Sequence, residues 1–218
     1  LDEPARLAEA LGPELRNTAA GRSEVLARGW DAARHARLAE AAQHARVTLN
    51  TLLQGAWALL LGRLAGRRQA LFGVTVSGRP ADWPQAQQTV GLFINSLPMW
   101  TGLDDEAAPA AWLRELQARN AELREVEHTA LGELQRWSGR SGEALFDSLL
   151  VFENYPLDEA LRAGHAAFEV RAVEAGERTH YPLTLIAVPR ADGLNLQWRW
   201  DTARMSAATV ARLAAYFD

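Results

Sequence analysis

The sequence predicts an α/β fold, an α+β sandwich in which helices flank a β-sheet. Residues 49–65 repeat apolar side chains at every third or fourth position, the spacing of a buried helix face, and Gly66 follows as a stop signal. Residues 70–76 come next and are rich in β-branched and aromatic side chains, which favours a strand. Residues 181–200 alternate apolar side chains around an Asp192-Gly193 turn, which is typical of a hairpin of half-buried strands.

The remaining elements follow from caps, turns and periodicity. Asp31, Thr48 and Ser206 stand where helix N-caps are expected. The further expected helices are a short one within residues 4–16 that is interrupted at Pro13, one from the Asp31 cap to about Arg46, one over 109–127, a short one over 128–139 and a final one over 207–217. The further expected strands lie over 21–29, 146–156, which we expect in the core, and 167–173. The expected buried positions are Ala32, Ala36, Leu38, Ala39 and Ala42 in the first long helix, Leu49, Leu52, Leu53, Ala56, Trp57, Leu60, Leu61 and Leu64 in the second, and Trp112, Leu113, Leu116 and Leu123 in the third.

Composition narrows the class of protein. The chain has 218 residues, of which 48% are hydrophobic, so it can bury a core as one domain or two small ones. A formal net charge of -4 argues against a general nucleic-acid partner. The absence of cysteine excludes disulfides, a thiol nucleophile and a thiolate metal site. No apolar run reaches membrane length and no signal peptide opens the chain, so we expect no membrane partner and a cytoplasmic location. Because the chain opens with Leu1 rather than Met, we expect a fragment of a longer protein.

No self-contained catalytic centre stands out in the sequence. None of the five histidines lies in an HxxxD or HExxH context, no serine lies in a GxSxG elbow, and no phosphate-binding loop is present. The acidic run at residues 104–106 is most simply a solvated first turn of a helix, so we expect no metal.

The most informative stretch is residues 70–100. A strand breaks at Ser77-Gly78-Arg79-Pro80, where Gly78 tolerates a positive φ. The chain then resumes with VGLFINSLP, in which Asn95 is a polar residue among apolar ones. Two interpretations remain open at this point. The first is a plain turn with a satisfied buried amide, and the second is a polar spot between apolar walls, lined by serine, arginine and asparagine.

The pattern is more specific than either interpretation. FGVTVSGRP followed by VGLFINSLP resembles the condensation domains of non-ribosomal peptide synthetases, with Ser96 where the family's GxFxNT-type motif usually has threonine. The segments VTLNTLLQGAWALLLGRL, FDSLLVFENYP and THYPLTL also resemble that family. The resemblance is clear from about Val47 to Pro189 and looser before that.

The resemblance implies one lobe of a larger enzyme. Condensation domains are built from two chloramphenicol-acetyltransferase-like lobes, each a mixed β-sheet flanked by helices. Their catalytic HHxxxDG motif lies in the first lobe and does not occur in this sequence. Residues 1–218 are therefore identified as the C-terminal lobe, half of a peptide-bond-forming acyltransferase domain that we expect to be inactive alone.

The resemblance also implies roles for residues 74–98. Residues 75–80 would form the floor loop of a substrate tunnel between the lobes. Ser77 would face the reaction centre, and Asn95 would orient substrate or brace the floor. Arg79 would pair with a carboxylate of the other lobe, with a purely structural role as the alternative. The implied tunnel residues are Thr75, Gly78, Arg79, Gly91 and Phe93. Residues 180–185 would supply a latch between the lobes.

The implied reaction joins an acyl or peptidyl thioester donor to an aminoacyl thioester acceptor. Both would arrive on the phosphopantetheine arms of carrier proteins, so we expect no cofactor bound directly to this chain. The other implied partners are the N-terminal lobe and an adjacent adenylation domain. Two alternatives remain open, namely a non-catalytic lobe that docks carrier proteins and a stand-alone acyltransferase of the same superfamily.

Overall fold

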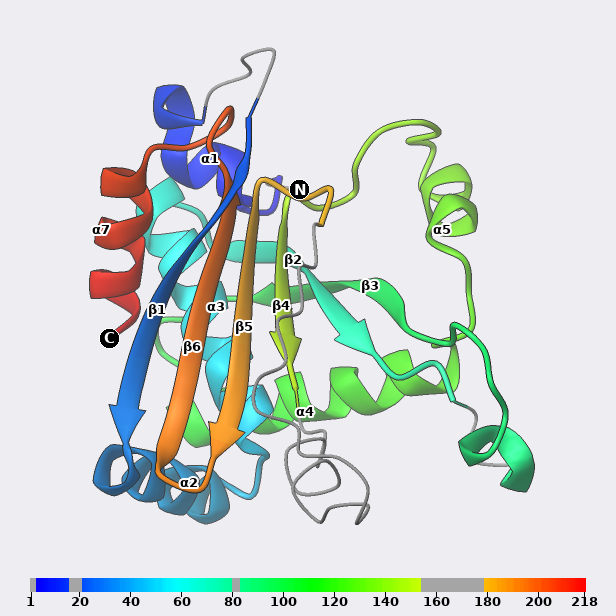
Figure 1. Cartoon of the computed structure of the whole chain (residues 1–218), viewed down its shortest axis with the longest axis horizontal. Helices are drawn as coiled ribbons and strands as arrows, with labels where there is room; N and C mark the ends of the chain where they lie inside the picture. Colours follow the sequence, from blue (N-terminus) through cyan, green and yellow to red (C-terminus); the bar gives the residue numbers. More distant parts are fainter. Residues whose placement is uncertain (1–2, 16–20, 80–82, 154–178) are drawn as a thin grey trace, which may run out of the picture.

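A computed structural model of the chain describes residues 3–15, 21–79, 83–153 and 179–218. These residues form one six-stranded sheet in the order β1-β6-β5-β4-β2-β3 (Figure 1). The strands are β1 (Ser23–Asp31), β2 (Gln69–Val76), β3 (Asn95–Gly102), β4 (Ser148–Phe152), β5 (Leu183–Arg190) and β6 (Gly193–Asp201). The pairs β2–β4 and β4–β5 are parallel, and the other pairs are antiparallel. The predicted mixed sheet flanked by helices is confirmed.

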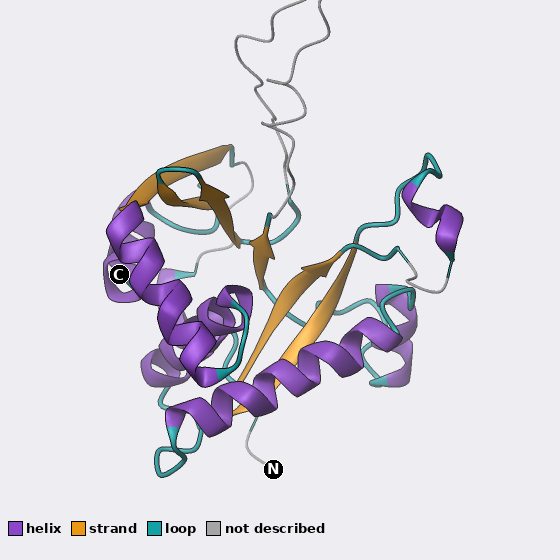
Figure 2. Ribbon diagram, turned by 90° about the horizontal axis from the view of Figure 1, so that it is seen from below, coloured by secondary structure: helices purple, strands orange, loops and turns teal. Residues whose placement is uncertain are grey.

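The helices gather on one side of this sheet, and α5 stands apart from them (Figures 1 and 2). The helices are α1 (Leu7–Leu11), α2 (Ala32–Ala45), α3 (Leu49–Ala65), α4 (Pro109–Glu125), α5 (Leu131–Trp137) and α7 (Ala207–Phe217). Two 3-10 turns, η1 (Gly12–Glu14) and η2 (Pro84–Gln87), complete the described elements. Within the described ranges, every helix is too short or too polar to cross a membrane.

Aromatic side chains fill the centre of the core. Trp57 of α3 meets Trp198 of β6 edge to face, with ring centroids 5.9 Å apart, and both contact Phe217 of α7 at 6.3 and 5.5 Å. The indole N–H of Trp57 donates to the Ser148 hydroxyl at 3.4 Å, which gives this buried donor a partner. The aromatic cluster therefore joins α3, α7 and the sheet.

The predicted caps are confirmed by their hydrogen bonds. Side-chain oxygens of Asp31, Thr48 and Ser206 accept the backbone N–H of the residue three positions later, at 2.7, 3.1 and 3.1 Å. Gly66 ends α3 in the left-handed conformation with φ 62°.

The predicted buried side of α2 is correct in part. Ala42 is buried and Leu38 packs half-buried against the core, as predicted, but Ala32, Ala36 and Ala39 are exposed. The outer alanines favour the helix through their intrinsic propensity and have no packing role. Leu64, which was expected on the buried face of α3, is also exposed, at the last turn of that helix.

The two strands of the C-terminal hairpin differ in burial. β6 alternates buried and half-buried residues as predicted, but residues 183–187 of β5 are all buried, so the predicted alternation is wrong there. β5 lies inside the sheet between β6 and β4, and a strand buried on both faces has no need to alternate. The strand expected over 167–173 lies outside the described residues.

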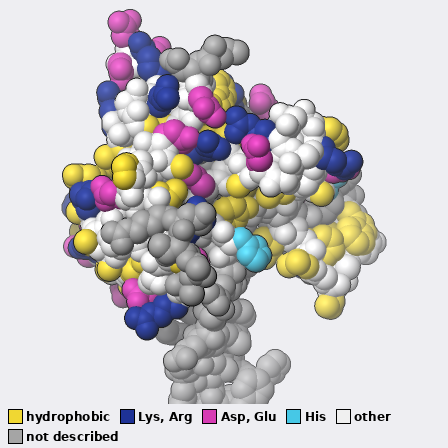
Figure 3. Space-filling model, turned by 90° about the horizontal axis from the view of Figure 1, so that it is seen from above, with side chains coloured by type: hydrophobic (Ala, Val, Ile, Leu, Met, Phe, Trp, Pro, Cys, Tyr) yellow, Lys and Arg dark blue, Asp and Glu magenta, His cyan; other side chains and the backbone are white. Residues whose placement is uncertain are grey.

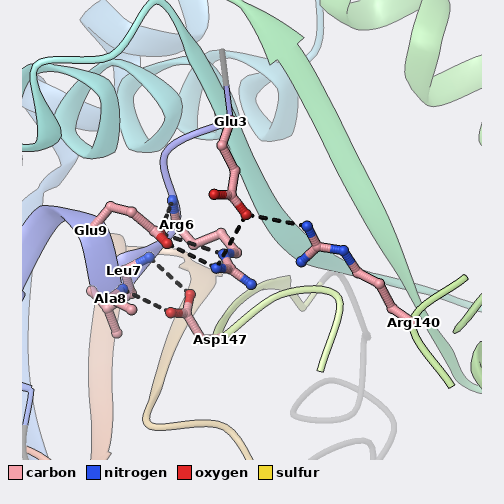
Figure 4. A network of polar contacts seen from close by, with 7 residues as sticks. All are labelled: Glu3, Arg6, Leu7, Ala8, Glu9, Arg140 and Asp147. Atoms are coloured by element: carbon pink, nitrogen blue, oxygen red, sulfur yellow. Dashed lines mark hydrogen bonds and ion pairs between the residues drawn. The ribbon is translucent and has the colours of Figure 1, made fainter. Parts of the chain in front are cut away.

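The N-terminal segment is attached to the chain just before β4. The Asp147 carboxylate accepts the backbone N–H groups of Leu7 and Ala8 at 2.8 and 2.7 Å, and Arg140 pairs with Glu3 at 3.1 Å (Figure 4). Burial raises the pKa of Asp147, and the two backbone hydrogen bonds offset part of that rise. Residues 3–8 are thereby held close to the start of β4.

The sheet opens where β2 leaves β4. Parallel pairing joins Gly73 and Val74 to Leu149 and Leu150. Gly73 is required at this crossing because a Cβ there would lie 2.2 Å from the Phe146 ring. Beyond this point β2 and β3 continue together away from β4 (Figure 1). The predicted floor loop therefore lies on a hairpin that projects from the sheet.

Candidate functional site

The two sequence motifs meet through their backbones. Gly78 has φ 62°, and a Cβ at this position would lie 1.8 Å from the Phe93 carbonyl oxygen. Only glycine combines this conformation with so close an approach. The end of β2 and the segment that enters β3 are consequently in direct contact.

Arg79 ties together the loop between β2 and β3. Its guanidinium lies over the Phe93 ring, 4.4 Å from the centroid, and Nη1 donates to the carbonyl oxygens of Thr89, at 3.2 Å, and Ala86. Trp83 packs beside Phe93 with ring centroids 6.1 Å apart. These contacts fit the purely structural role of Arg79, which was the alternative to a pairing with a carboxylate of the other lobe.

Ser77 is exposed at the end of β2. Its Oγ accepts the Arg79 backbone N–H at 3.4 Å, which leaves the hydroxyl hydrogen available to another acceptor. Thr75 is half-buried and pairs with Ser96 across the β2–β3 ladder. Ser77 is therefore the hydroxyl of this site that a bound molecule can reach.

Asn95 directs its amide into the protein. Nδ2 donates to the carbonyl oxygens of Glu127 and Thr129 at 2.9 and 2.7 Å, and Oδ1 accepts the Ser96 N–H at 2.9 Å. Glu127 and Thr129 lie in the connection between α4 and α5, so Asn95 attaches that connection to β3. These bonds use both amide hydrogens and one oxygen lone pair.

Several large apolar side chains of the loop between β2 and β3 are exposed in the described part of the chain. Val90 and Leu92 are 100% and 91% exposed, and Trp83 and Ile94 are also exposed. Figure 3 shows hydrophobic side chains gathered on the side of the molecule that carries this loop and α5. Several exposed apolar side chains in one segment mark an interaction surface rather than random exposure.

Sequence reasoning missed the contact of Tyr181 with Phe146, which precedes β4. The two rings stack with their centroids 5.0 Å apart. Burial raises the pKa of Tyr181. Tyr181 precedes β5 and lies far along the chain from Phe146, so no local pattern in the sequence links the two residues.

The structure brings most of the expected site residues together. Ser77, Gly78, Arg79, Phe93 and Asn95 lie at one end of the β2–β3 hairpin. Gly91 is exposed beside the Phe93 ring, which a Cβ at this position would approach to 3.2 Å. Pro80, the last residue of the expected floor loop, lies outside the described residues. Over the described part of the chain, no three His, Asp or Glu side chains group closely enough to hold a metal ion.

Comparisons with known proteins agree on one family. The Condensation domain family model matches residues 4–218. The chain is 43% identical over 178 residues to a linear gramicidin synthase of Brevibacillus parabrevis, covering 77% of this chain and 4% of that protein. It is 46% identical over 170 residues to chondramide synthase cmdD of Chondromyces crocatus, covering 78% of this chain and 4% of that protein.

Solved structures share the fold. The first condensation domain of the calcium-dependent antibiotic synthetase superimposes with a TM-score of 0.71 at 18% identity, covering 96% of this chain and 48% of that one. The X-domain from teicoplanin biosynthesis superimposes with a TM-score of 0.72 at 20% identity, covering 96% of this chain and 50% of that one. The chain thus spans about half the length of these solved chains and a few per cent of the curated relatives.

Proposed function

Because the chain belongs to the condensation-domain family, whose general activity is amide bond formation, we propose that it is the C-terminal lobe of a condensation domain in a non-ribosomal peptide synthetase. The observation that carries this proposal is the contact between Gly78 and Phe93, which joins the two motifs at the exposed end of a projecting hairpin. The catalytic histidine motif would lie in an N-terminal lobe outside residues 1–218. The lobe alone would then be inactive.

The proposed reaction is an acyl transfer from sulfur to nitrogen. The amine of an aminoacyl thioester attacks the carbonyl carbon of an acyl or peptidyl thioester, forming a C–N bond and a tetrahedral oxyanion. The C–S bond then breaks, the donor arm leaves as a thiol, and the amine loses one proton. Amine and thioester already react with one another, so holding them in register can supply much of the rate.

Ser77 is the residue of this lobe that we assign to the reaction centre. Among the described residues, its Oγ is engaged only as an acceptor in the bond with Arg79, so its hydroxyl hydrogen can donate to a developing oxyanion. Its exposure at the tip of β2 suits a group that meets a substrate held between two lobes. Thr75, Gly78, Arg79, Gly91 and Phe93 would form the adjoining tunnel floor.

The exposed apolar side chains favour a large partner. Val90 and Leu92 would be covered by the N-terminal lobe, since that lobe is the one partner that every condensation domain of this kind would share. Carrier proteins would deliver both substrates on phosphopantetheine arms, and an adenylation domain would load the acceptor carrier. We place the assembly in the cytoplasm.

A second candidate function rests on Asn95 and Arg79. Asn95 uses its amide on three backbone groups, and Arg79 uses Nη1 on two carbonyl oxygens of its own loop. Both patterns favour a lobe that shapes the tunnel and docks carriers without supplying a reacting group. Under this alternative Ser77 is dispensable.

Substitution of Ser77 separates the two candidates. Ser77→Ala is introduced into the complete protein that carries this chain, and amide product is measured from loaded donor and acceptor carriers in single-turnover experiments. Ser141→Ala is the matched control, because Ser141 is an exposed serine in the loop after α5. If Ser77 donates to the oxyanion, its removal lowers the rate by about 10- to 1000-fold and Ser141→Ala leaves it unchanged.

Asn95→Ala serves as the second arm of the experiment. It leaves the partly buried carbonyl oxygens of Glu127 and Thr129 without their donor, so we expect a loss of about 1–3 kcal/mol in stability whichever candidate holds. Normal turnover by Ser77→Ala, with carrier binding intact, would support the docking lobe and reject the catalytic assignment.

A further inference from the structure

Residues 3–8 lie along an edge of β2 that no other described strand covers. Ala5 pairs with β2 in parallel, because its N–H donates to the Gln69 carbonyl oxygen at 2.7 Å and its carbonyl oxygen accepts the Leu71 N–H at 2.8 Å. β3 pairs with β2 along the same residues from the other edge, and β4 pairs with β2 from Gly73 onward. Ala5 therefore extends the sheet on the β4 side of β2, ahead of β4 itself.

Asp147 holds the same segment from the side of β4. Its carboxylate accepts the N–H groups of Leu7 and Ala8 at 2.8 and 2.7 Å, and it points toward them (Figure 4). Arg140, in the loop between α5 and β4, pairs with Glu3 at 3.1 Å. Hydrogen bonds to a charged acceptor are stronger than those between neutral groups, whereas exposed ion pairs contribute little. Asp147 is therefore the stronger of these two attachments.

The attached segment is also part of the core. Ala5 and Leu7 are fully shielded from solvent, and Leu11 at the end of α1 is buried as well. All three belong to the main hydrophobic cluster of the sheet and its helices. A flexible linker would leave its backbone and side chains in water, so this segment is fixed on the lobe from Glu3 onward.

We propose that residues 3–8 are the docked end of the connection between the two lobes, and that Asp147 is the positioning residue that fixes this connection on the C-terminal lobe. The inference rests on the proposed function, because such a connection exists only if an N-terminal lobe precedes residue 1. The hinge between the lobes then lies upstream of Glu3.

This attachment couples the spacing of the lobes to the strand that leads to the site. β2 begins at Gln69, which bonds to Ala5, and ends at Val76, which Ser77 follows. If the connection shifts on this lobe, the N-terminal lobe shifts relative to Ser77. Because a displacement of about 1 Å between reacting groups can lower a rate about 100-fold, a fixed attachment protects the reacting geometry.

The test releases the segment in the complete protein. Asp147→Ala removes both acceptors, and Asp192→Ala is the matched control, because Asp192 is an exposed aspartate in the turn between β5 and β6. Glu3→Ala with Arg140→Ala removes the ion pair and leaves the buried bonds in place. Spin labels in the N-terminal lobe and at Arg28→Cys, an exposed position on β1, report the distance between the lobes. Amide hydrogen exchange and amide formation are measured on the same variants.

We expect Asp147→Ala to speed amide exchange in residues 5–8 and at Leu71 by about 10- to 100-fold, because two charge-assisted hydrogen bonds are lost. The distribution of distances between the lobes should broaden, and kcat should fall by about 10-fold with KM unchanged. In the variant without the ion pair, exchange should rise by less than about 5-fold, because that pair is exposed. The control variant should match the parent protein.

Two results would overturn the role of Asp147. One is unchanged exchange in residues 5–8. The other is faster exchange there with an unchanged distribution of distances between the lobes, which would make Asp147 a structural residue of this lobe alone. If α3 also loses protection in Asp147→Ala, the lobe has unfolded, and the distances in the variant without the ion pair decide the question.

Failure of the proposed function gives a different result. A parent protein that holds two lobes but forms no amide would reject the proposed reaction, while the distances between its lobes still decide whether Asp147 fixes their connection. A complete protein without a second lobe would reject both proposals.

Discussion

Gly78 offers the most direct test of the contact that builds the site. An alanine there would keep φ near 62°, which costs about 1–2 kcal/mol for a residue with a Cβ. Its Cβ would also lie 1.8 Å from the Phe93 carbonyl oxygen, and because that atom belongs to the backbone, one of the two segments must move. Overpacking of this kind costs about 1–3 kcal/mol more. A shift of about 1 Å at Ser77 would lower the rate of amide formation on the order of 100-fold.

Gly66 provides the matched control, since its φ is also 62° but a Cβ there would meet no atom within 4 Å. Gly66→Ala should therefore show the conformational cost alone and leave amide formation unchanged. Hydrogen exchange in residues 77–79 and 91–95, measured beside single-turnover rates, separates the two effects. Equal losses of stability in the two variants, or a normal rate in Gly78→Ala, would refute the reasoning.

Three further predictions concern the framework behind the site. Gly73→Ala should lower the free energy of unfolding by about 1–3 kcal/mol, because its Cβ would clash with the Phe146 ring. The double variant Gly73→Ala with Phe146→Leu should lose less stability than the sum of the two single variants, because the smaller side chain leaves room for the new methyl group. Strictly additive losses in urea titrations would contradict the close contact between Gly73 and Phe146. Burial raises the pKa of Asp147, so the folded chain binds the proton of this carboxyl group more tightly than the unfolded chain does. The contribution of this proton to the free energy of unfolding is fully present below the ordinary carboxyl pKa range. It is lost as pH rises through the raised pKa. As pH rises from the ordinary carboxyl range through the raised pKa of Asp147, the parent should therefore lose stability relative to Asp147→Asn, and a relative gain would contradict this sign. Trp57→Phe should cost about 1–3 kcal/mol, because it leaves the buried Ser148 hydroxyl without its donor, whereas an unchanged thermal midpoint would show that the 3.4 Å bond contributes nothing.

The geometry of Asn95 changes what that residue is expected to do. The sequence shows it as a polar residue among apolar ones, and the resemblance to condensation domains implies that it orients substrate or braces the floor. Its hydrogen bonds to Glu127, Thr129 and Ser96 place the amide in the support of the α4–α5 connection. A substitution there acts first on the position of β3, and effects on amide formation follow from that movement.

Local elements could be predicted because their causes are local. A cap such as Thr48 needs only a side-chain oxygen and an N–H three residues later, and the turn at Asp192-Gly193 needs only a residue with freedom at positive φ. The long helix α3 and the strand β6 have apolar patterns that match their burial over most of their length. The two motifs FGVTVSGRP and VGLFINSLP also pointed to the family, because their residues follow the order and spacing found in condensation domains.

The sequence by itself thus determined the capped helices, the C-terminal hairpin and the pair of motifs that build the site. Only the tertiary structure decided the strand order, the exposure of Ala32, Ala36 and Ala39, the burial of β5 on both faces and the stacking of Tyr181 on Phe146. The physical reason is the distance along the chain between the residues that interact. Capping and turn energies depend on neighbours within a few residues, whereas strand pairing and burial depend on which distant segments meet, and a single sequence carries no local sign of those partners.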